Sequence, residues 1–548
     1  MKRIIILFYF FVLCWGTKAQ KRPNIVLIMA DDMGFSDIGC YGSEIETPNL
    51  DKLSANGVRF TQFYNTSRCC PSRASLLTGL YSHQAGMGLM IEDRTEKPGY
   101  RGFLVRERST SIAELLSGAG YGTYMTGKWH LGYREKEEQP LAWGFDQFYG
   151  SFEGAISYFE PGNTNKYPHD KNPRHITLNN DTITADKNFY ATNRFTDYGL
   201  LFLDQHFNER KDDPFFLYLA YNAPHWPLHA LPNDIKKYED KYLKGWDRLR
   251  KERYQRQLDL GVLEAGSTSL SPRTDDRYDE AGLWPYTRKP LPAWDSLDEK
   301  QRKDLAKKMA VYAAIVDNMD QNIGRLVDFL RMKGQLENTV VLFLSDNGGD
   351  IVGRVMGFND LGERGNLDLY GTTNSFMSYG LGWANASNTP FRMYKCYVHE
   401  GGISSPLIVQ WPKGIKNAVG SFVRVPSHIT DIMPTLLDVA RVKYPDSTIE
   451  RPIIPMQGQS LLPLMNGNPK KFNEDRRIFW EHAGNKAVRD GRWKLVKVQK
   501  GPWELYDMDN DRCEQNNLVS KYPERVERME IMYNDWAEKA YVNPPLNE

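Results

Sequence analysis

The chain has 548 residues, with 70 Lys and Arg against 69 Asp and Glu, and 41% of its residues are hydrophobic. That composition supports a large core and excludes a wholly disordered protein. A formal net charge of +1 argues against a protein that coats nucleic acid, because phosphate binding depends on an excess of Lys and Arg. Six cysteines in this length do not describe a disulfide-stapled mini-domain. We expect a large globular enzyme.

The first residues have the layout of a secretory signal peptide. Lys2 and Arg3 precede an apolar run from Ile4 to Trp15, and small residues follow at a cleavage position near residue 19. The run is about 12 residues, whereas a membrane span needs roughly 20. The alternative is a buried N-terminal strand. We predict a signal peptide over residues 1–19, no membrane span, and a periplasmic or secreted mature protein.

Strands and helices then alternate. Asn24–Ala30 is a continuous apolar run, which is typical of a strand buried on both faces of a parallel sheet. Similar patterns predict strands over 121–126, 215–220 and 340–344, and helices over 48–56, 71–78, 111–118 and 309–330. Such alternation predicts an α/β fold with a doubly wound mixed sheet.

Two stretches, about 154–200 and 232–300, interrupt this alternation, and we interpret them as insertions in one catalytic domain over residues 20–444. After residue 445 the pattern changes to short strands with a hairpin turn at Asp490-Gly491, followed by an amphipathic helix near 523–540. This change predicts a C-terminal subdomain of antiparallel sheet plus helix over residues 445–548.

Two polar pairs follow predicted buried strands. Asp31 and Asp32 follow the first strand, and Asp346 and Asn347 follow the strand over 340–344. Open α/β sheets place ligand sites at the carboxyl ends of their strands. Either pair alone is compatible with a turn or a helix cap. Together, four oxygen-bearing side chains indicate a site for a hard divalent cation such as Ca²⁺ or Mg²⁺.

Between these pairs lies Cys69-Cys70-Pro71-Ser72-Arg73, which continues to Leu-Thr-Gly at residues 77–79. Here the chain resembles the type I sulfatase family, whose first signature is Cys-x-Pro-Ser-Arg, three residues, then Leu-Thr-Gly. The second signature is present as GTYMTGKWHLG over residues 122–132, and the stretches 223–227 and 390–402 look most similar to the bacterial arylsulfatase branch. The resemblance runs from about residue 24 to 541. It implies an alkaline-phosphatase-like fold and a sulfuric ester hydrolase.

The resemblance also implies that a maturation enzyme oxidises Cys69 to formylglycine, whose hydrate is a gem-diol. One hydroxyl attacks sulfur, and the other releases sulfate from the sulfo-enzyme intermediate by re-forming the aldehyde, which divides one difficult step into two. Cys69 is also expected to precede a helix, whose N-terminal N–H groups favour an anion. The spacing to Pro71 and Arg73 assigns this role to Cys69, so Cys70 is interpreted as structural.

By the same resemblance, Asp31, Asp32, Asp346 and Asn347 bind one Ca²⁺, which also touches the modified Cys69. The asparagine matters because related phosphatases carry a histidine there, as Zn²⁺ prefers, whereas an amide oxygen suits a hard ion.

The remaining implied roles belong to side chains around the sulfate. Lys128 is a point charge on the sulfate, Arg73 braces the nucleophile, and His130 contacts a gem-diol hydroxyl. His225 and Lys395 bind sulfate and protonate the leaving oxygen, and such general acid catalysis accelerates the departure of the leaving group. Asp346 accepts the attacking proton, and Ser157 is a further candidate substrate contact.

These inferences predict an exported sulfatase that acts on a carbohydrate sulfate, such as sulfated galactose of a mucin-like glycan. Several aromatic residues lie in and near the insertions, namely Tyr158, Tyr167, Trp284, Trp294 and Trp383. Their side chains can stack on sugar rings, belong to the core or cover an aryl group. The alternatives are an arylsulfatase of broad specificity, a phosphonate or phosphodiester hydrolase on the same fold, and a catalytically inactive glycan-binding protein. The intact Cys69 motif argues against the last.

Overall fold

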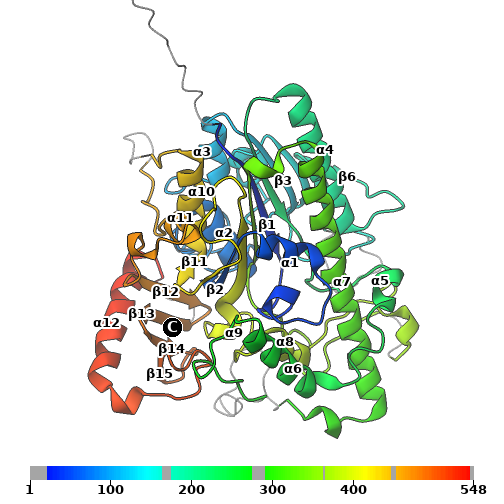
Figure 1. Ribbon diagram of the computed structural model, residues 1–548, viewed down its shortest axis with the longest axis vertical. Coiled ribbons are helices and arrows are strands. Elements are labelled where there is room, and N and C mark those ends of the chain that lie inside the picture. The colour runs from blue at the N-terminus through cyan, green and yellow to red at the C-terminus, as the bar shows by residue number, and fades with distance from the viewer. Residues whose placement is uncertain (1–20, 163–173, 274–290, 362–364, 446–451, 543–548) are drawn as a thin grey trace, which may run out of the picture.

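The computed structural model describes residues 21–162, 174–273, 291–361, 365–445 and 452–542. Within these ranges the main feature is an eleven-stranded mixed sheet, ordered β10-β2-β9-β8-β1-β7-β3-β4-β5-β6, with β11 beside β2 (Figure 1). Its strands are β1 (Asn24–Ala30), β2 (Val58–Tyr64), β3 (Gly122–Lys128), β4 (Gln147–Ser151), β5 (Ile176–Leu178), β6 (Asp181–Ile183), β7 (Phe215–Ala220), β8 (Thr339–Ser345), β9 (Ser404–Gln410), β10 (Phe422–Val423) and β11 (Ser427–His428).

Helices cover both faces of this sheet (Figure 1). They are α1 (Pro48–Ala55), α2 (Cys69–Thr78), α3 (Ile112–Gly118), α4 (Ala191–Glu209), α5 (Pro232–Lys236), α6 (Gly245–Asp259), α7 (Glu299–Met332), α8 (Leu381–Ser387), α9 (Glu400–Ile403), α10 (Ile432–Ala440), α11 (Leu462–Met465) and α12 (Pro523–Lys539). Within these described ranges, no helix is both long enough and apolar enough to cross a bilayer.

The central strand β1 explains the two layers. Val26 and Ile28 pack into a core with α1, α4 and α7, whereas Ile25, Leu27 and Met29 pack into a second core with α2, α3 and α10. Successive side chains of a strand point to opposite faces, so a strand buried on both sides must be apolar throughout. This arrangement confirms the predicted α/β fold with a doubly wound mixed sheet.

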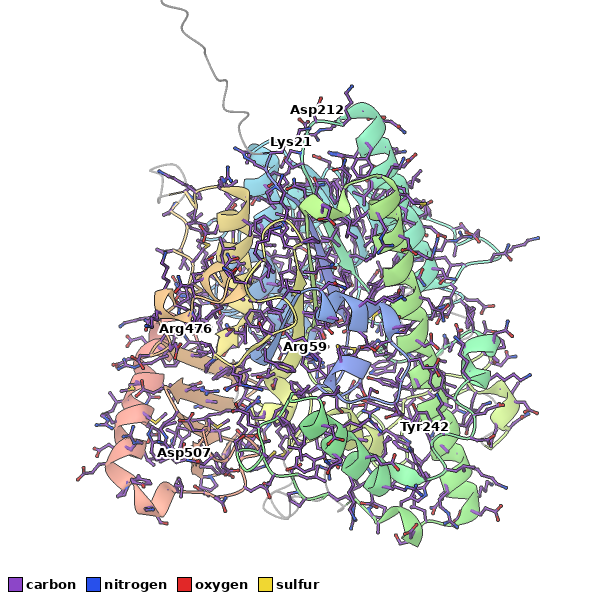
Figure 2. All side chains as sticks on the ribbon, viewed as in Figure 1. Lys21, Arg59, Asp212, Tyr242, Arg476 and Asp507 are labelled. Atoms are coloured by element: carbon purple, nitrogen blue, oxygen red, sulfur yellow. The ribbon has the colours of Figure 1, made fainter. Side chains whose placement is uncertain are left out.

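The order of the strands determines where the site lies. β8, β1, β7 and β3 are adjacent and parallel, so their carboxyl ends meet at one edge of the sheet. β9 is antiparallel to both β8 and β2. The residues before β9 and those after β2 therefore reach the same edge. The residues that precede β1 and β7 lie at the opposite edge, where Lys21 pairs with Asp212 across 3.0 Å (Figure 2).

Local sequence signals predicted the central strands β1, β3, β7 and β8 and several of the helices. The predicted capping box at the start of α3 is present, because Ser111 Oγ accepts from Glu114 N and the Glu114 carboxylate accepts from Ser111 N. The helix expected to begin at Pro71 begins two residues earlier, at Cys69, so Cys69 belongs to its first turn. The first stretch interpreted as an insertion, about 154–200, contains the start of α4, which ends at Glu209.

The C-terminal part forms a separate sheet of four antiparallel strands in chain order. They are β12 (Arg477–His482), β13 (Asn485–Asp490), β14 (Trp493–Lys497) and β15 (Trp503–Asp507). The predicted hairpin turn joins β13 to β14, and α12 packs on these strands through Met529, Tyr533 and Ala537. The antiparallel sheet with its helix is confirmed, whereas the division at residue 444 stays a prediction. The predicted signal peptide lies outside the described residues.

Candidate active site

The structure gathers the predicted site residues at the shared sheet edge. These side chains come from the ends of β1, β3 and β8, from the loops nearby and from α2, and each residue is at most 5% exposed. The set is Asp31, Asp32, Cys69, Arg73, Lys128, His130, His225, Asp346, Asn347 and Lys395. Charges buried to this extent need partners of opposite sign or a bound ion.

Each buried cation in this group has a carboxylate partner. Lys128 Nζ lies 2.6 Å from Asp31 Oδ2, and Lys395 Nζ lies 2.6 Å from Asp32 Oδ1. Arg73 donates to Asp346 Oδ2 at 3.0 Å and to the Lys128 carbonyl oxygen at 2.9 Å. The guanidinium of Arg73 therefore links the ends of β8 and β3, which fixes the spacing between two parts of the site.

The carboxyl groups differ in how strongly they hold a proton. Burial raises the pKa of Asp346 to about 8, and the charge of Asp31 adds to this effect. Burial also raises the pKa of Asp32, although Lys395 opposes it. At Asp31 burial is outweighed by Lys128, His225 and Arg73, which hold its pKa below the ordinary value. A divalent ion would favour the ionised form of all three groups.

Two oxygen atoms in this group have the character of metal ligands. Asp31 Oδ1 and Asn347 Oδ1 are buried and have no hydrogen-bond partner within the described ranges. Asn347 instead uses its amide nitrogen, which donates to Asp32 Oδ1 at 2.6 Å. Ligand atoms of Asp31, Asp32 and His225 also lie within 4.8 Å of one another. Oxygen atoms from carboxylates and an amide fit a hard cation such as Ca²⁺.

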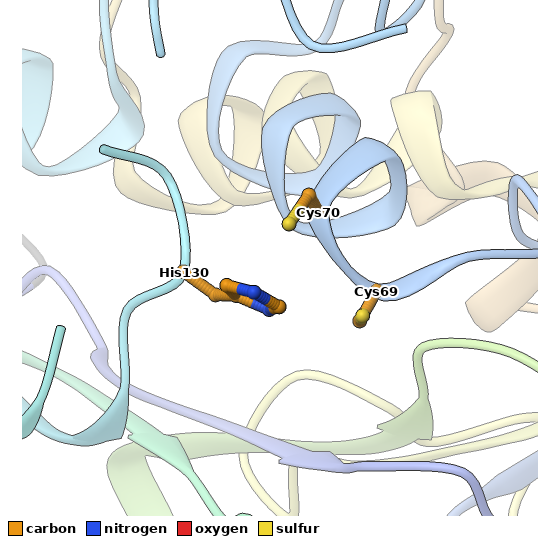
Figure 3. Close-up of side chains that lie close together, drawn as sticks. All are labelled: Cys69, Cys70 and His130. Carbon is orange, nitrogen blue, oxygen red and sulfur yellow. The ribbon is translucent and has the colours of Figure 1, made fainter. Parts of the chain in front are cut away.

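Cys69 lies in the first turn of α2 and faces His130 (Figure 3). Ligand atoms of Cys69, Cys70 and His130 lie within 4.8 Å of one another. A hydrogen bond from Cys70, assisted by Lys128 and His130, lowers the pKa of the Cys69 thiol well below its usual value despite burial. His130 has a positive φ of 58°, and its Nδ1 has no hydrogen-bond partner in the part of the chain that the structure covers.

This second cluster differs chemically from the first. Two sulfurs and an imidazole form a donor set for a soft ion such as Zn²⁺, not for Ca²⁺. Oxidation of Cys69 to an aldehyde would remove one of the two sulfurs and with it this donor set. Cys70 lies in the first turn of α2, and its thiol, whose pKa burial raises, packs into the second core.

The other candidates lie elsewhere. Ser157 Oγ is 3.4 Å from His229 Nδ1 and accepts from Glu160 N at 3.1 Å, so its side chain is engaged in its own loop. Tyr158 is buried and donates to the carbonyl oxygens of Asn222 and His225. Trp294 and Trp383 pack against each other and Trp246 in the core, which favours the core interpretation for both. Tyr167 and Trp284 lie outside the described residues.

Two residues that the sequence analysis did not select lie against this group. Asp350 Oδ2 is 3.4 Å from Lys395 Nζ and accepts a hydrogen bond from Trp226 Nε1 at 3.0 Å. The sequence contained a signal for Asp350, since it follows Asn347 by three residues at the same strand end. For Trp226 the only signal in the sequence was its position beside His225.

Comparisons with known proteins agree with this geometry. The sulfatase family profile matches residues 23–442, and the profile of the N-sulphoglucosamine sulphohydrolase C-terminal region matches residues 391–535. An uncharacterized sulfatase of Schizosaccharomyces pombe is 36% identical over 92% of this chain and 91% of its own length. The arylsulfatase of Klebsiella aerogenes is 32% identical over 85% of this chain and 96% of its own length.

Two further similarities are more distant. The N-acetylglucosamine-6-O-sulfatase of Bacteroides thetaiotaomicron is 28% identical over 93% of this chain and 85% of its own. The crystal structure of Ps i-CgsB in complex with k-i-k-neocarrahexaose superposes with a TM-score of 0.66 at 24% identity, covering 94% of this chain and 93% of the other. The family matches and the shared fold lead to one conclusion: this chain belongs to the sulfatase family and is a sulfuric ester hydrolase.

Proposed function

We propose that the protein is an exported, formylglycine-dependent sulfatase that hydrolyses a sulfate monoester on a carbohydrate. The observation that carries the proposal is the position of Cys69. Its sulfur lies at the start of α2, next to His130, and the positive charges of Lys128 and Lys395 help to lower the pKa of its thiol. A sulfate group at that point would meet the free N–H groups of the helix and these cations together.

The groups that the protein would acquire fit this arrangement. Formylglycine at position 69 would supply a hydroxyl nucleophile, and Ca²⁺ at Asp31, Asp32, Asp346 and Asn347 would supply positive charge beside the transferring sulfate. We assign Arg73 to brace this centre, because it already ties Asp346 to the Lys128 carbonyl.

His225 and Lys395 would act on the sulfate and on its leaving group. Burial lowers the pKa of His225 to about 3, so its imidazole is neutral at physiological pH and can hold a sulfate oxygen only by donating an N–H. Lys395 keeps its proton because Asp32 and Asp350 outweigh the effect of burial and raise its pKa. We therefore assign Lys395 to protonate the leaving oxygen and His225 to hold the sulfate. We assign Lys128 to hold the sulfate as well, because its ammonium group lies 2.6 Å from Asp31 within the same site.

The carbohydrate assignment rests on relatives and on the cell compartment. A relative of similar length is named for N-acetylglucosamine 6-O-sulfate, which is a sugar sulfate. A signal peptide over residues 1–19 would place the enzyme where polymeric glycans occur outside the cytoplasm. Sulfated galactose of a mucin-like glycan stays the proposed example, and 6-sulfated hexosamines are the next substrates to examine.

The test is a screen of position-defined sulfated monosaccharides and glycans with enzyme whose Cys69 conversion has been verified by mass spectrometry. 4-Nitrophenyl sulfate and 4-nitrophenyl phosphate serve as reference substrates. Turnover of one sugar sulfate above the aryl sulfate supports the proposal. Activity on the aryl sulfate alone refutes the carbohydrate assignment, and dominant phosphate turnover refutes the sulfatase assignment of this site.

Cys69→Ala is the control for the nucleophile. It removes the group that is converted while the surrounding charges stay in place, so we expect the variant to bind substrate and to turn none over. Ligand binding with no turnover in both forms would favour a glycan-binding protein.

A further inference from the structure

Asp350 joins the proposed acid to an aromatic side chain. It lies in the loop after β8, is 7% exposed, and uses its Oδ2 atom twice. That oxygen lies 3.4 Å from Lys395 Nζ and accepts from Trp226 Nε1 at 3.0 Å, while Oδ1 accepts from Val352 N at 3.1 Å. A carboxylate held by its own loop therefore sets the distance between a lysine and an indole that are far apart in sequence.

Trp226 belongs to a small aromatic cluster with Phe358 and Phe376, which we name the aromatic rim. Its ring meets Phe358 at 5.5 Å and Phe376 at 6.0 Å, both nearly edge-on, and those two rings lie 5.7 Å apart. All three side chains are partly exposed, unlike the buried Trp294 and Trp383. The rim also adjoins the sulfate-facing residues, because the His225 and Trp226 rings are 4.9 Å apart.

We propose that Trp226 binds the pyranose ring that carries the sulfate, and that Asp350 is a positioning residue which holds Trp226 and Lys395 in a fixed relation. This inference rests on the proposed function, since only a sulfatase reaction defines a leaving group here. Indole faces pack well against the apolar C–H face of a sugar. Two phenyl rings and one hydrogen bond restrict the indole, so little side-chain entropy is lost on binding.

The same geometry explains why the rim and the acid must be coupled. Lys395 has two acidic neighbours, Asp32 at 2.6 Å and Asp350 at 3.4 Å. Without the charge of Asp350, the ammonium group would be drawn toward Asp32 alone, which would shift the proposed acid within the site. A shift of about 1 Å in a catalytic group can cost roughly a hundredfold in rate.

Three substitutions separate these roles. Asp350→Asn keeps an oxygen for the indole N–H but removes the charge beside Lys395. Trp226→Phe keeps an aromatic ring but removes the N–H, and Trp226→Ala removes both. Trp503→Ala, in β15 of the C-terminal sheet, is the matched control for loss of a partly exposed tryptophan. Circular dichroism and the melting temperature check that each variant is folded.

The experiment measures kcat and KM of converted, Ca²⁺-loaded enzyme on its sugar sulfate and on 4-nitrophenyl sulfate. We expect Trp226→Ala to raise KM for the sugar sulfate about tenfold, with Trp226→Phe between it and the wild type. We expect Asp350→Asn to lower kcat at least a hundredfold on the sugar sulfate, whose alkoxide needs a proton, but less than tenfold on 4-nitrophenyl sulfate.

Two results would overturn the inference. One is an unchanged KM for the sugar sulfate in Trp226→Ala. The other is an equal fall in kcat on both substrates in Asp350→Asn, which is what a merely structural role predicts. Failure of the proposed function is a separate outcome, because wild-type converted enzyme would then not hydrolyse the sugar sulfate.

Discussion

Glu400 offers a test of how the C-terminal sheet is attached to the catalytic core. It lies in α9, five residues after Lys395, and is fully buried. Its carboxylate accepts from Tyr64 Oη at 3.0 Å, Lys494 Nζ at 3.1 Å and Arg512 Nη2 at 3.2 Å. Glu400→Gln removes the charge with almost no change of volume.

The expected cost follows from the cations left behind. Removing one partner of a buried ion pair costs about 3–5 kcal/mol, because the other charge stays buried without compensation. Lys494 keeps Glu514 Oε1 at 2.8 Å, so we expect a loss near the lower end, about 3 kcal/mol of unfolding free energy. Adding Lys494→Met removes the stranded cation, so the double variant should recover at least half of the loss.

Urea unfolding followed by tryptophan fluorescence measures both effects. Glu524→Gln on the exposed side of α12 is the matched control and should change stability by less than about 0.5 kcal/mol. A cost below about 1 kcal/mol for Glu400→Gln would refute the argument that this charge network is essential. So would a double variant whose cost equals the sum of the two single costs.

Three more outcomes are expected. Chelation should lower the melting temperature and abolish turnover, and added Ca²⁺ should restore both. Because burial raises the pKa of Asp346 to about 8, Ca²⁺ affinity should rise with pH up to that value. Calorimetry that shows tighter binding at pH 6 than at pH 8 would contradict this. Burial lowers the pKa of His482 to about 4, so below pH 6.5 only the unfolded chain gains this proton and the folded state loses stability. His482→Gln should remove roughly 2 kcal/mol of the stability lost between pH 7 and pH 5. Urea titrations in which the variant loses as much stability as the wild type would contradict this prediction. Gly127→Ala should abolish soluble expression, because φ is 103° and the added Cβ would lie 1.8 Å from the Ala220 carbonyl oxygen, whereas Gly118→Ala, which meets nothing within 4 Å, should express and melt as the wild type does.

Local sequence patterns are sufficient for the central strands and for several helices. β1 and β7 have the predicted bounds, and α3 begins at the predicted capping box. A strand buried on both faces must be apolar at every position, and a helix N-terminus must satisfy its free N–H groups, so both leave marks within a few residues. The predicted start of α2 is two residues late, because proline favours the first helical position but is also compatible with a later position in the first turn, where Pro71 lies.

The family and the candidate residues can be identified from the sequence, because the Cys69 motif and the two polar pairs are short and contiguous. Which aromatic side chains are available to a substrate depends instead on tertiary packing. Trp294 and Trp383 occur in polar, loop-like sequence but lie in the core, whereas Trp226 is partly exposed beside His225. Its contact with Asp350 joins segments 124 residues apart. Such a contact depends on the order of strands in the sheet, which is set by packing between distant segments and leaves no periodic pattern in the chain.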